Sequence, residues 1–254
     1  MSKVSIVLPS YNGERFIRES IESVIAQDYD NWELIIIDDC SSDSTPEICE
    51  EYVRRDSRIS YHRNEQNLKL PASLNKGFSF ATGDYLTWTS DDNYFRHDAI
   101  GLMARALDDD AAVDVVYCDI NCVDENGNAL NLPKITTSKH FLPIINVVRA
   151  CFMYRKRVHE KLEGYDETLF LVEDYDFWLR SYRYFNLRYI DEAPYYYRFH
   201  ERSLSKTKEL DIRRLTKKIL RRELEHESRL PRRFSLMCGI LVSDLRTLLI
   251  KIKR

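Results

Sequence analysis

Apolar and polar positions follow two regular patterns over the first 110 residues. Short apolar runs rich in Val, Ile and aromatic residues, typical of strands, occupy 4–9, 32–39, 59–63 and 84–88. After each run, apolar residues recur at three- and four-residue spacing, which predicts helices over 13–27, 44–55, 72–81 and 97–108. Four strand–helix repeats predict a parallel, doubly wound α/β sheet with right-handed crossovers.

The pattern changes after Val113. Residues 114–124 and 129–133 read as two strands of a hairpin, because Asn126-Gly127 between them is a strong turn signal. A helix is predicted over 164–185, with aromatic residues on a side suited to core packing, and a strand over 187–191.

Polar clusters follow three of the first four predicted strands, at 9–12, 38–42 and 90–93. In doubly wound sheets, ligands bind at the carboxyl ends of the strands, where these clusters fall. Asp91 and Asp92 could hold Mg2+ or Mn2+, which prefer oxygen ligands. Asp39 could accept a hydrogen bond from a base, and Tyr11 could lie against a ring. The alternative for each cluster is an ordinary polar turn.

Charge is distributed unevenly along the 254 residues. The net charge is -3, which gives no reason to expect nucleic acid as a partner. Residues 206–254 carry 15 Lys and Arg against 6 Asp and Glu, whereas residues 1–205 carry 23 against 35. The hydrophobic content of 44% and charged content of 31% are those of a folded globular protein.

The six cysteines form no CxxC pair and do not read as a disulfide framework. Reduced thiols, together with the absence of a signal peptide or an 18-residue apolar run, predict a cytoplasmic protein.

Three stretches resemble family 2 glycosyltransferases of the GT-A fold, which are inverting and use nucleotide-diphospho-sugars. "SIVLPSYNGERFIRESIESVIAQDYDNWELIIIDDCSSDST" is similar to the family's opening, and "ATGDYLTWTSDDNYF" resembles its metal-binding strand end. "LEGYDETLFLVEDYDFWLR" resembles the segment that holds the catalytic base. The resemblance covers residues 3 to about 205.

The resemblance implies a role for each matching residue. Asp174 would be the general base, Asp92 and His200 would lie at a Mn2+ or Mg2+ ion, and Asp91 would touch the ribose or the metal shell. The nucleoside pocket would be lined by Pro9, Tyr11, Asn12 and Asp39. The alternatives are a solvated first helical turn for Asp174 and its neighbour Glu173, and a structural histidine for His200.

The chain departs from the family pattern at three positions. Asn93 stands at the family's third acidic position. Lys69 replaces a usual Gly, and Leu74 replaces an Arg found in many members. The last two changes leave the donor sugar open.

The resulting prediction is a GT-A domain over 1–205, with a nucleotide-binding half (1–112) and an acceptor-binding half (113–205), followed by a basic helical extension over 206–254. The predicted reaction moves a sugar, with uridine diphosphate as the favoured carrier, to a hydroxyl of a glycan or lipid-linked acceptor in cell-surface polysaccharide synthesis. A sugar nucleotidyltransferase and a degenerate member that binds glycan or a partner are the alternatives.

The basic extension combines cationic and apolar residues, with Pro231 between two helical segments. Such a segment can lie at the inner face of a membrane, pack on its own domain or bind a second subunit. The apolar residues are Phe234, Met237, Ile240, Leu241, Leu245, Leu248, Leu249 and Ile252.

Overall fold

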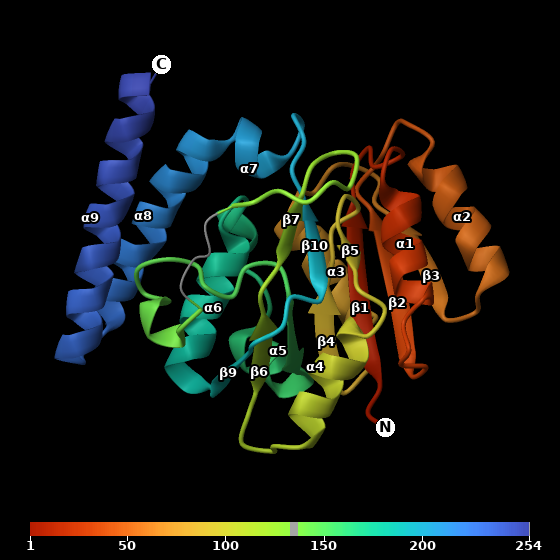
Figure 1. Cartoon of the computed structure of the whole chain (residues 1–254), viewed down its shortest axis with the longest axis horizontal. Coiled ribbons are helices and arrows are strands. Elements are labelled where there is room, and N and C mark those ends of the chain that lie inside the picture. The colour runs from red at the N-terminus through yellow and green to blue at the C-terminus, as the bar shows by residue number, and fades with distance from the viewer. Residues whose placement is uncertain (133–136, 254) are drawn as a thin grey trace.

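Helices cover both faces of a seven-stranded sheet (Figure 1). The computed structural model describes residues 1–132 and 137–253, with side chains through residue 247. β8 runs antiparallel to both of its neighbours, β4 and β6, and every other pairing in this sheet is parallel, which confirms the predicted mostly parallel α/β sheet. In spatial order the strands are β3 (Ile59–Arg63), β2 (Trp32–Asp38), β1 (Val4–Ser10), β4 (Tyr85–Trp88), β8 (Phe152–Arg155), β6 (Val115–Cys118) and β9 (Leu187–Ile190).

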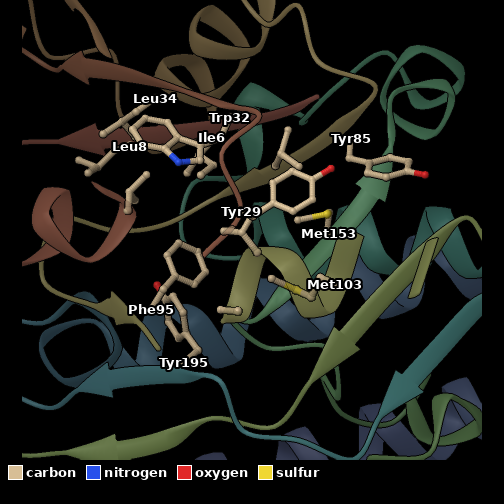
Figure 2. Close-up of a cluster of buried hydrophobic side chains, with 14 of the residues drawn as sticks. Ile6, Leu8, Tyr29, Trp32, Leu34, Tyr85, Phe95, Met103, Met153 and Tyr195 are labelled. Atoms are coloured by element: carbon tan, nitrogen blue, oxygen red, sulfur yellow. The ribbon is translucent and has the colours of Figure 1, made fainter. Parts of the chain in front are cut away.

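Both faces of the sheet are buried, so β1 is buried at every position and β2 at all but one, rather than at alternate positions. In β1, Ile6 and Leu8 enter one cluster and Val7 enters the other. The first cluster, shown in Figure 2, lies under α1 (Ile17–Ile25), α2 (Thr45–Arg55) and α4 (Ala99–Asp108). The second lies under α3 (Leu70–Ser79), α5 (Lys156–Leu162) and α6 (Glu173–Tyr184).

A second sheet of three short strands brings distant segments together. Its order is β5 (Tyr94–Phe95), β10 (Tyr195–Arg198) and β7 (Asn121–Val123). β10 is antiparallel to β5, so the residues that precede β5 lie beside those that follow β10. This pairing positions the candidate site residues that lie just before β5 and just after β10.

The predicted hairpin over 114–133 is wrong in its strands. The first predicted strand, 114–124, is interrupted, because the chain leaves the large sheet after β6 and enters the small one at β7, and residues 129–132 of the second form no strand. The turn forms, because the Asp124 side chain accepts from the backbone N–H groups of Asn126 and Asn128. Among the described residues, one isolated antiparallel β-bridge, between Val123 and Ala129, joins the two sides of this turn. Pro133, the predicted end, lies outside the described residues.

The helix predicted over 164–185 begins only at Glu173. Gly164 and Leu171 adopt φ angles of 74° and 85°, which a helix cannot contain, and only a 3-10 turn, η2 (Glu167–Leu169), lies between them. The shorter helix places Glu173 and Asp174 in its first turn. The strands β8 and β10 were not predicted.

The C-terminal extension is helical, as predicted. It contains α7 (Leu204–Thr207), α8 (Glu209–His226) and α9 (Leu230–Lys253); η1 (Lys139–Phe141) lies earlier in the chain. Pro231 is the second residue of α9 rather than the break itself, in the first turn where proline is tolerated. Among the described residues, no helix is both long and apolar enough to span a bilayer.

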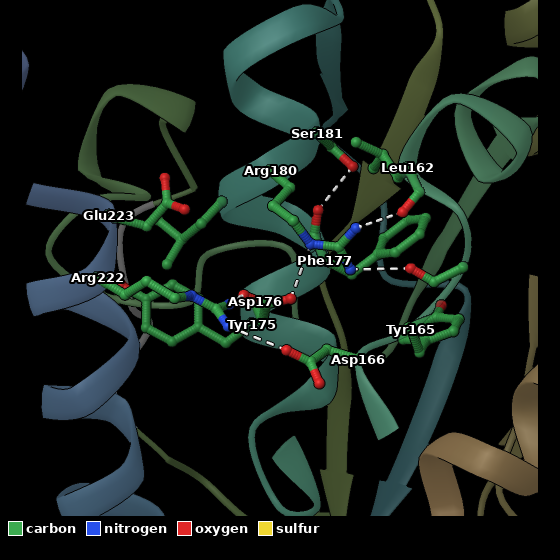
Figure 3. Close-up of polar contacts among 12 residues, drawn as sticks. Leu162, Tyr165, Asp166, Tyr175, Asp176, Phe177, Arg180, Ser181, Arg222 and Glu223 are labelled. Atoms are coloured by element: carbon green, nitrogen blue, oxygen red, sulfur yellow. Dashed lines mark hydrogen bonds and ion pairs between the residues drawn. The ribbon is translucent and has the colours of Figure 1, made fainter. Parts of the chain in front are cut away.

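A buried carboxylate ties this extension to the sheet domain (Figure 3). Asp176 of α6 is fully buried, accepts from Arg180 at 2.8 Å and pairs with Arg222 of α8. Arg222 also reaches Asp166, at 3.0 Å. Two arginines and one further carboxylate therefore join α6, α8 and the 162–166 loop.

Candidate active site

The three predicted polar clusters meet at one edge of the large sheet. β1 pairs with β2 so that Ser10 lies opposite Asp38, and it pairs with β4 so that Val7 lies opposite Trp88. The carboxyl ends of the three strands are therefore adjacent.

Asp39 is buried, and its carboxylate already accepts three hydrogen bonds. Asn64 Nδ2 donates to it at 2.8 Å, and the backbone N–H groups of Leu68 and Lys69 donate at 2.7 and 2.9 Å. A carboxylate offers about four acceptor sites, so roughly one is left for a ligand N–H. Lys69 has φ 73°, a left-handed conformation that glycine adopts without strain, which explains why a Gly suits this position. Leu74 is fully buried in the core and does not face the edge.

The loop after β1 is fixed to the loop after β2 through Asn12. Its backbone N–H donates to Ser41 Oγ at 2.9 Å, and its Oδ1 accepts from the Ser42 N–H at 2.8 Å. Tyr11 is 53% exposed, so one face of its ring is available to a flat ligand. Pro9 is buried within β1.

Asp91 contacts this loop directly. Ser10 Oγ donates to Asp91 Oδ2 at 2.5 Å. A Cβ atom on Gly13 would lie 2.2 Å from the same oxygen, so only glycine allows this approach. Burial of the carboxyl, followed by the nearby charge of Asp92, raises the pKa of Asp91 to about 7.

Asp92, just before β5, and His200, just after β10, meet at 2.9 Å between Oδ2 and Nε2. The other oxygen, Asp92 Oδ1, is buried without a hydrogen-bond partner in the described part of the chain. An orphaned carboxylate oxygen beside an imidazole suits a divalent cation, so these two residues fit the predicted metal ion. Across residues 1–132 and 137–253, no group of three or more His, Cys, Asp or Glu forms a fuller site. A cation here would take its remaining ligands from a diphosphate and water.

Asn93, at the family's third acidic position, has a structural role. It is buried, accepts from the Arg198 N–H at 2.8 Å and donates to Ser90 Oγ at 2.7 Å. An ionised Asp could accept from Arg198 but could not donate to Ser90.

Arg198 is a residue that sequence reasoning missed. It is 3% exposed, donates to the Asp92 carbonyl at 2.9 Å and pairs with Glu19 at 2.5 Å. The Arg198 guanidinium carbon also lies over the rings of Phe16 and Tyr94, 4.7 and 5.3 Å from their centroids, so the side chain is enclosed on these sides as well. Arg198 therefore fixes the backbone that presents Asp92. An arginine inside "YYYRFH" carries no motif that would have indicated this.

Asp174 lies half-buried at the start of α6 and accepts two hydrogen bonds. Asn146 Nδ2 donates to Oδ2 at 2.9 Å, and the Tyr175 N–H donates to Oδ1 at 2.6 Å. Burial raises the pKa of Asp174 to about 6, with these bonds opposing the rise. The neighbouring Glu173 is 4% exposed, and burial, followed by the charge of Asp174, raises its pKa to about 8. Glu173 therefore holds its proton to a higher pH than Asp174 does.

The pKa of Tyr197 responds to the charges of both Asp92 and Asp174. Burial is the main cause that raises the pKa of Tyr197 to about 12, and the charges of both carboxylates add to it. A pocket of about 350 Å3 opens beside Asp174, between α6, the 144–146 segment and the C-terminal helices. Its lining includes Ile144, Asn146, Arg213, Val242 and Arg246, but not Glu173.

An acidic edge at the carboxyl ends of a doubly wound sheet, with a pocket beside it, is where proteins of this architecture bind their ligands. The glycosyl transferase family 2 model matches residues 5–163, and the chain belongs to that family. A Methanocaldococcus jannaschii protein named "Uncharacterized glycosyltransferase MJ1057" is 31% identical over 185 residues, covering 70% of this chain and 63% of the relative. "Putative glycosyltransferase EpsE" of Bacillus subtilis is 34% identical over 195 residues, which cover 73% of this chain and 70% of the relative.

Solved structures of low identity share the fold. S. aureus TarS 1–349 in complex with UDP-GlcNAc has a TM-score of 0.76 at 20% identity, covering 95% of this chain and 72% of TarS 1–349. Mannosyltransferase PcManGT from Pyrobaculum calidifontis, in complex with GDP-Man and Mn2+, has a TM-score of 0.69 at 15% identity, covering 94% and 69%. These likenesses confirm the predicted GT-A fold.

Proposed function

We propose that this protein is an inverting glycosyltransferase that moves a sugar from uridine diphosphate to an acceptor hydroxyl. One observation carries the proposal: at the carboxyl ends of adjacent strands, Asp92 is paired with His200 at 2.9 Å and keeps a buried carboxylate oxygen without a partner in the described part of the chain. A pocket beside Asp174 supplies a second carboxylate that an acceptor could reach. The complex of TarS with UDP-GlcNAc supports uridine as the nucleoside, and the sugar stays open.

The donor would bind along the strand ends. Tyr11 offers an exposed ring to the base, and the remaining acceptor site of Asp39 suits a base N–H. Pro9 and Asn12 would shape the nucleoside pocket, and Asp91 would lie at the ribose or the metal shell. Asp92 and His200 would hold Mn2+ or Mg2+. A bound cation of this kind supplies positive charge to the leaving diphosphate.

The acceptor would enter the pocket beside Asp174. Its hydroxyl would donate to the Asp174 carboxylate, which would take the proton during attack on the anomeric carbon. Asn146 and the Tyr175 N–H hold that carboxylate in place and favour its ionised form. A single displacement of this kind inverts the anomeric centre and needs no protein nucleophile.

The acceptor is a growing surface glycan or its lipid-linked precursor in this proposal, and the setting is cytoplasmic. All six cysteines are free thiols, which agrees with a reducing compartment. α9 carries an exposed apolar stripe suited to the membrane interface: Leu230, Phe234, Met237, Leu241 and Leu245. The side chains of Leu248, Leu249 and Ile252 lie outside the described ones.

Calorimetry with uridine diphosphate and Mn2+ tests the donor site. We expect binding that strengthens when Mn2+ is added, and we expect Asp92→Ala to remove the Mn2+ effect. A panel of nucleotide sugars, assayed for nucleotide release, then identifies the donor. If neither Mn2+ nor Asp92→Ala changes the affinity for the nucleotide, the metal role of Asp92 is excluded. If no nucleotide binds, a degenerate member is favoured.

A further inference from the structure

A second cavity of about 660 Å3 lies at the opposite end of α6 from Asp174. It is bordered by the 139–143 segment, the last residues of α6 and the first residues of α9. We call it the basic pocket, because its lining includes Lys139, His140, Arg183, Arg229 and Arg232.

The positive charges of the basic pocket exceed the negative charges that pair with them. Arg183 pairs with Glu223 at 2.7 Å, Arg229 pairs with Glu227 at 3.0 Å, and Arg232 shares the same two carboxylates, at 3.8 and 3.1 Å. The ammonium group of Lys139 donates to the carbonyl of Leu187, which carries no charge. Four permanent cations therefore have two carboxylate partners.

Arg232 has donor capacity that the described residues do not use. Its side chain is 7% exposed and donates from Nη2 to the Leu179 carbonyl at 3.0 Å. Its Nη1 is buried without a hydrogen-bond partner in the described part of the chain. A buried N–H of a charged group left without an acceptor costs at least about 1–3 kcal/mol, so an acceptor from outside the chain would be favoured.

The first turn of α9 adds to this preference. Arg229, Pro231 and Arg232 all line the basic pocket, so the helix begins at its wall. The first N–H groups of a helix lack intrahelical acceptors and favour an anion. In α9 the Arg229 N–H already donates to Glu227 Oε1 at 2.9 Å and Pro231 has no N–H, so this contribution is smaller than that of the side chains. A phosphate group carries up to two negative charges and three acceptor oxygens, which matches an excess of two cations better than a carboxylate does.

We propose that the basic pocket binds a phosphate group, supplied either by the headgroup of an anionic lipid or by a free phosphorylated molecule. Leu230 and Phe234, which are 78% and 69% exposed in the same part of α9, would accompany a phosphate attached to an apolar chain. The proposal does not depend on the glycosyltransferase reaction.

The test uses the full chain and two probes: inorganic phosphate in calorimetry, and flotation with phosphatidylcholine vesicles with or without phosphatidylglycerol. The pocket variant is Lys139→Ala with Arg229→Ala. The control, Arg214→Ala with Arg221→Ala, removes the same charge from exposed positions of α8 that do not line the pocket. Thermal unfolding and nucleotide binding establish that both variants are folded.

We expect the unmodified chain to bind at least one probe, and the pocket variant to bind it about tenfold or more weakly, since two charge-assisted contacts are lost. The control should stay within about twofold. Binding of phosphate would indicate a free ligand, and binding of phosphatidylglycerol vesicles alone would indicate a lipid. Binding of neither probe, or equal loss in both variants, would overturn the proposal.

Discussion

Substitution of Asn146 tests the assignment of Asp174 as the general base without removing the base itself. Asn146 donates to Asp174 Oδ2 at 2.9 Å and so favours the ionised carboxylate. Loss of this bond in Asn146→Ala should raise the pKa of Asp174 above its present value of about 6. A general base must be ionised. As the pH is lowered, the variant should therefore lose activity at a higher pH than the unmodified enzyme does.

The size of the shift follows from the strength of the bond. A hydrogen bond to a charged group contributes about 1.5–3 kcal/mol, and about 1.4 kcal/mol corresponds to one pKa unit. Water in the adjacent open pocket would replace part of the bond, so we expect a rise of about one unit. Relative to the unmodified enzyme, kcat/KM should fall about fivefold at pH 6 and change little at pH 8.5.

Two measurements check this shift. The first is the pH profile of nucleotide release from pH 5 to 9, and the second is carbon NMR titration of the Asp174 carboxyl, which needs no substrate. Asn31→Ala, an exposed asparagine next to the amino end of β2, is the matched control. A profile that Asn146→Ala leaves unchanged, or moves to lower pH, would refute the link between Asn146 and the base.

Four further predictions concern individual residues of the site and of the buried ion pairs. Asp174→Asn should reduce transfer about 100-fold or more with donor binding intact, while Glu173→Gln, which mimics the neutral acid, should stay within a few-fold at pH 7. Glu173 has a raised pKa, so the unmodified chain should lose thermal stability from pH 5 to 8, and Glu173→Gln should lose less. Gly13→Ala should weaken nucleotide binding in calorimetry, because its Cβ would displace Asp91. Asp176→Ala should lower the free energy of unfolding in urea by about 3–5 kcal/mol, and a change below 1 kcal/mol would contradict the buried ion-pair role.

The donor edge could be predicted because its residues directly follow strands. Asp39 and Asp91 come one and three residues after apolar runs that a periodicity argument identifies, and parallel strands end at one edge. The residues of the small sheet could not be placed in this way. The contact between Asp92 and His200 spans 108 positions and depends on β10, a four-residue strand without a distinct pattern. Propensity does not indicate such non-local pairing.

The pocket beside Asp174 was beyond sequence reasoning for a different reason. Asn146 belongs to no motif, and its partner is 28 residues away. The helix at 173–184 was predicted too long, because nothing in "GYDETLFLV" indicates the left-handed backbone at Leu171. Because the helix starts at Glu173 rather than at Gly164, the first turn of α6 faces the pocket instead of lying within a longer helix.

The pocket beside Asp174 lies partly outside the family match. That match ends at residue 163, so it contains the strand ends proposed to bind the nucleotide but neither Asp174 nor the C-terminal helices. Residues of α8 and α9, among them Arg213 and Arg246, form one wall of the pocket beside Asp174. Asp176 holds α8 in position through Arg222. If the acceptor enters this pocket, its selection depends on a segment that the family model leaves unmatched, and the 206–254 extension takes part in specificity as well as in attachment.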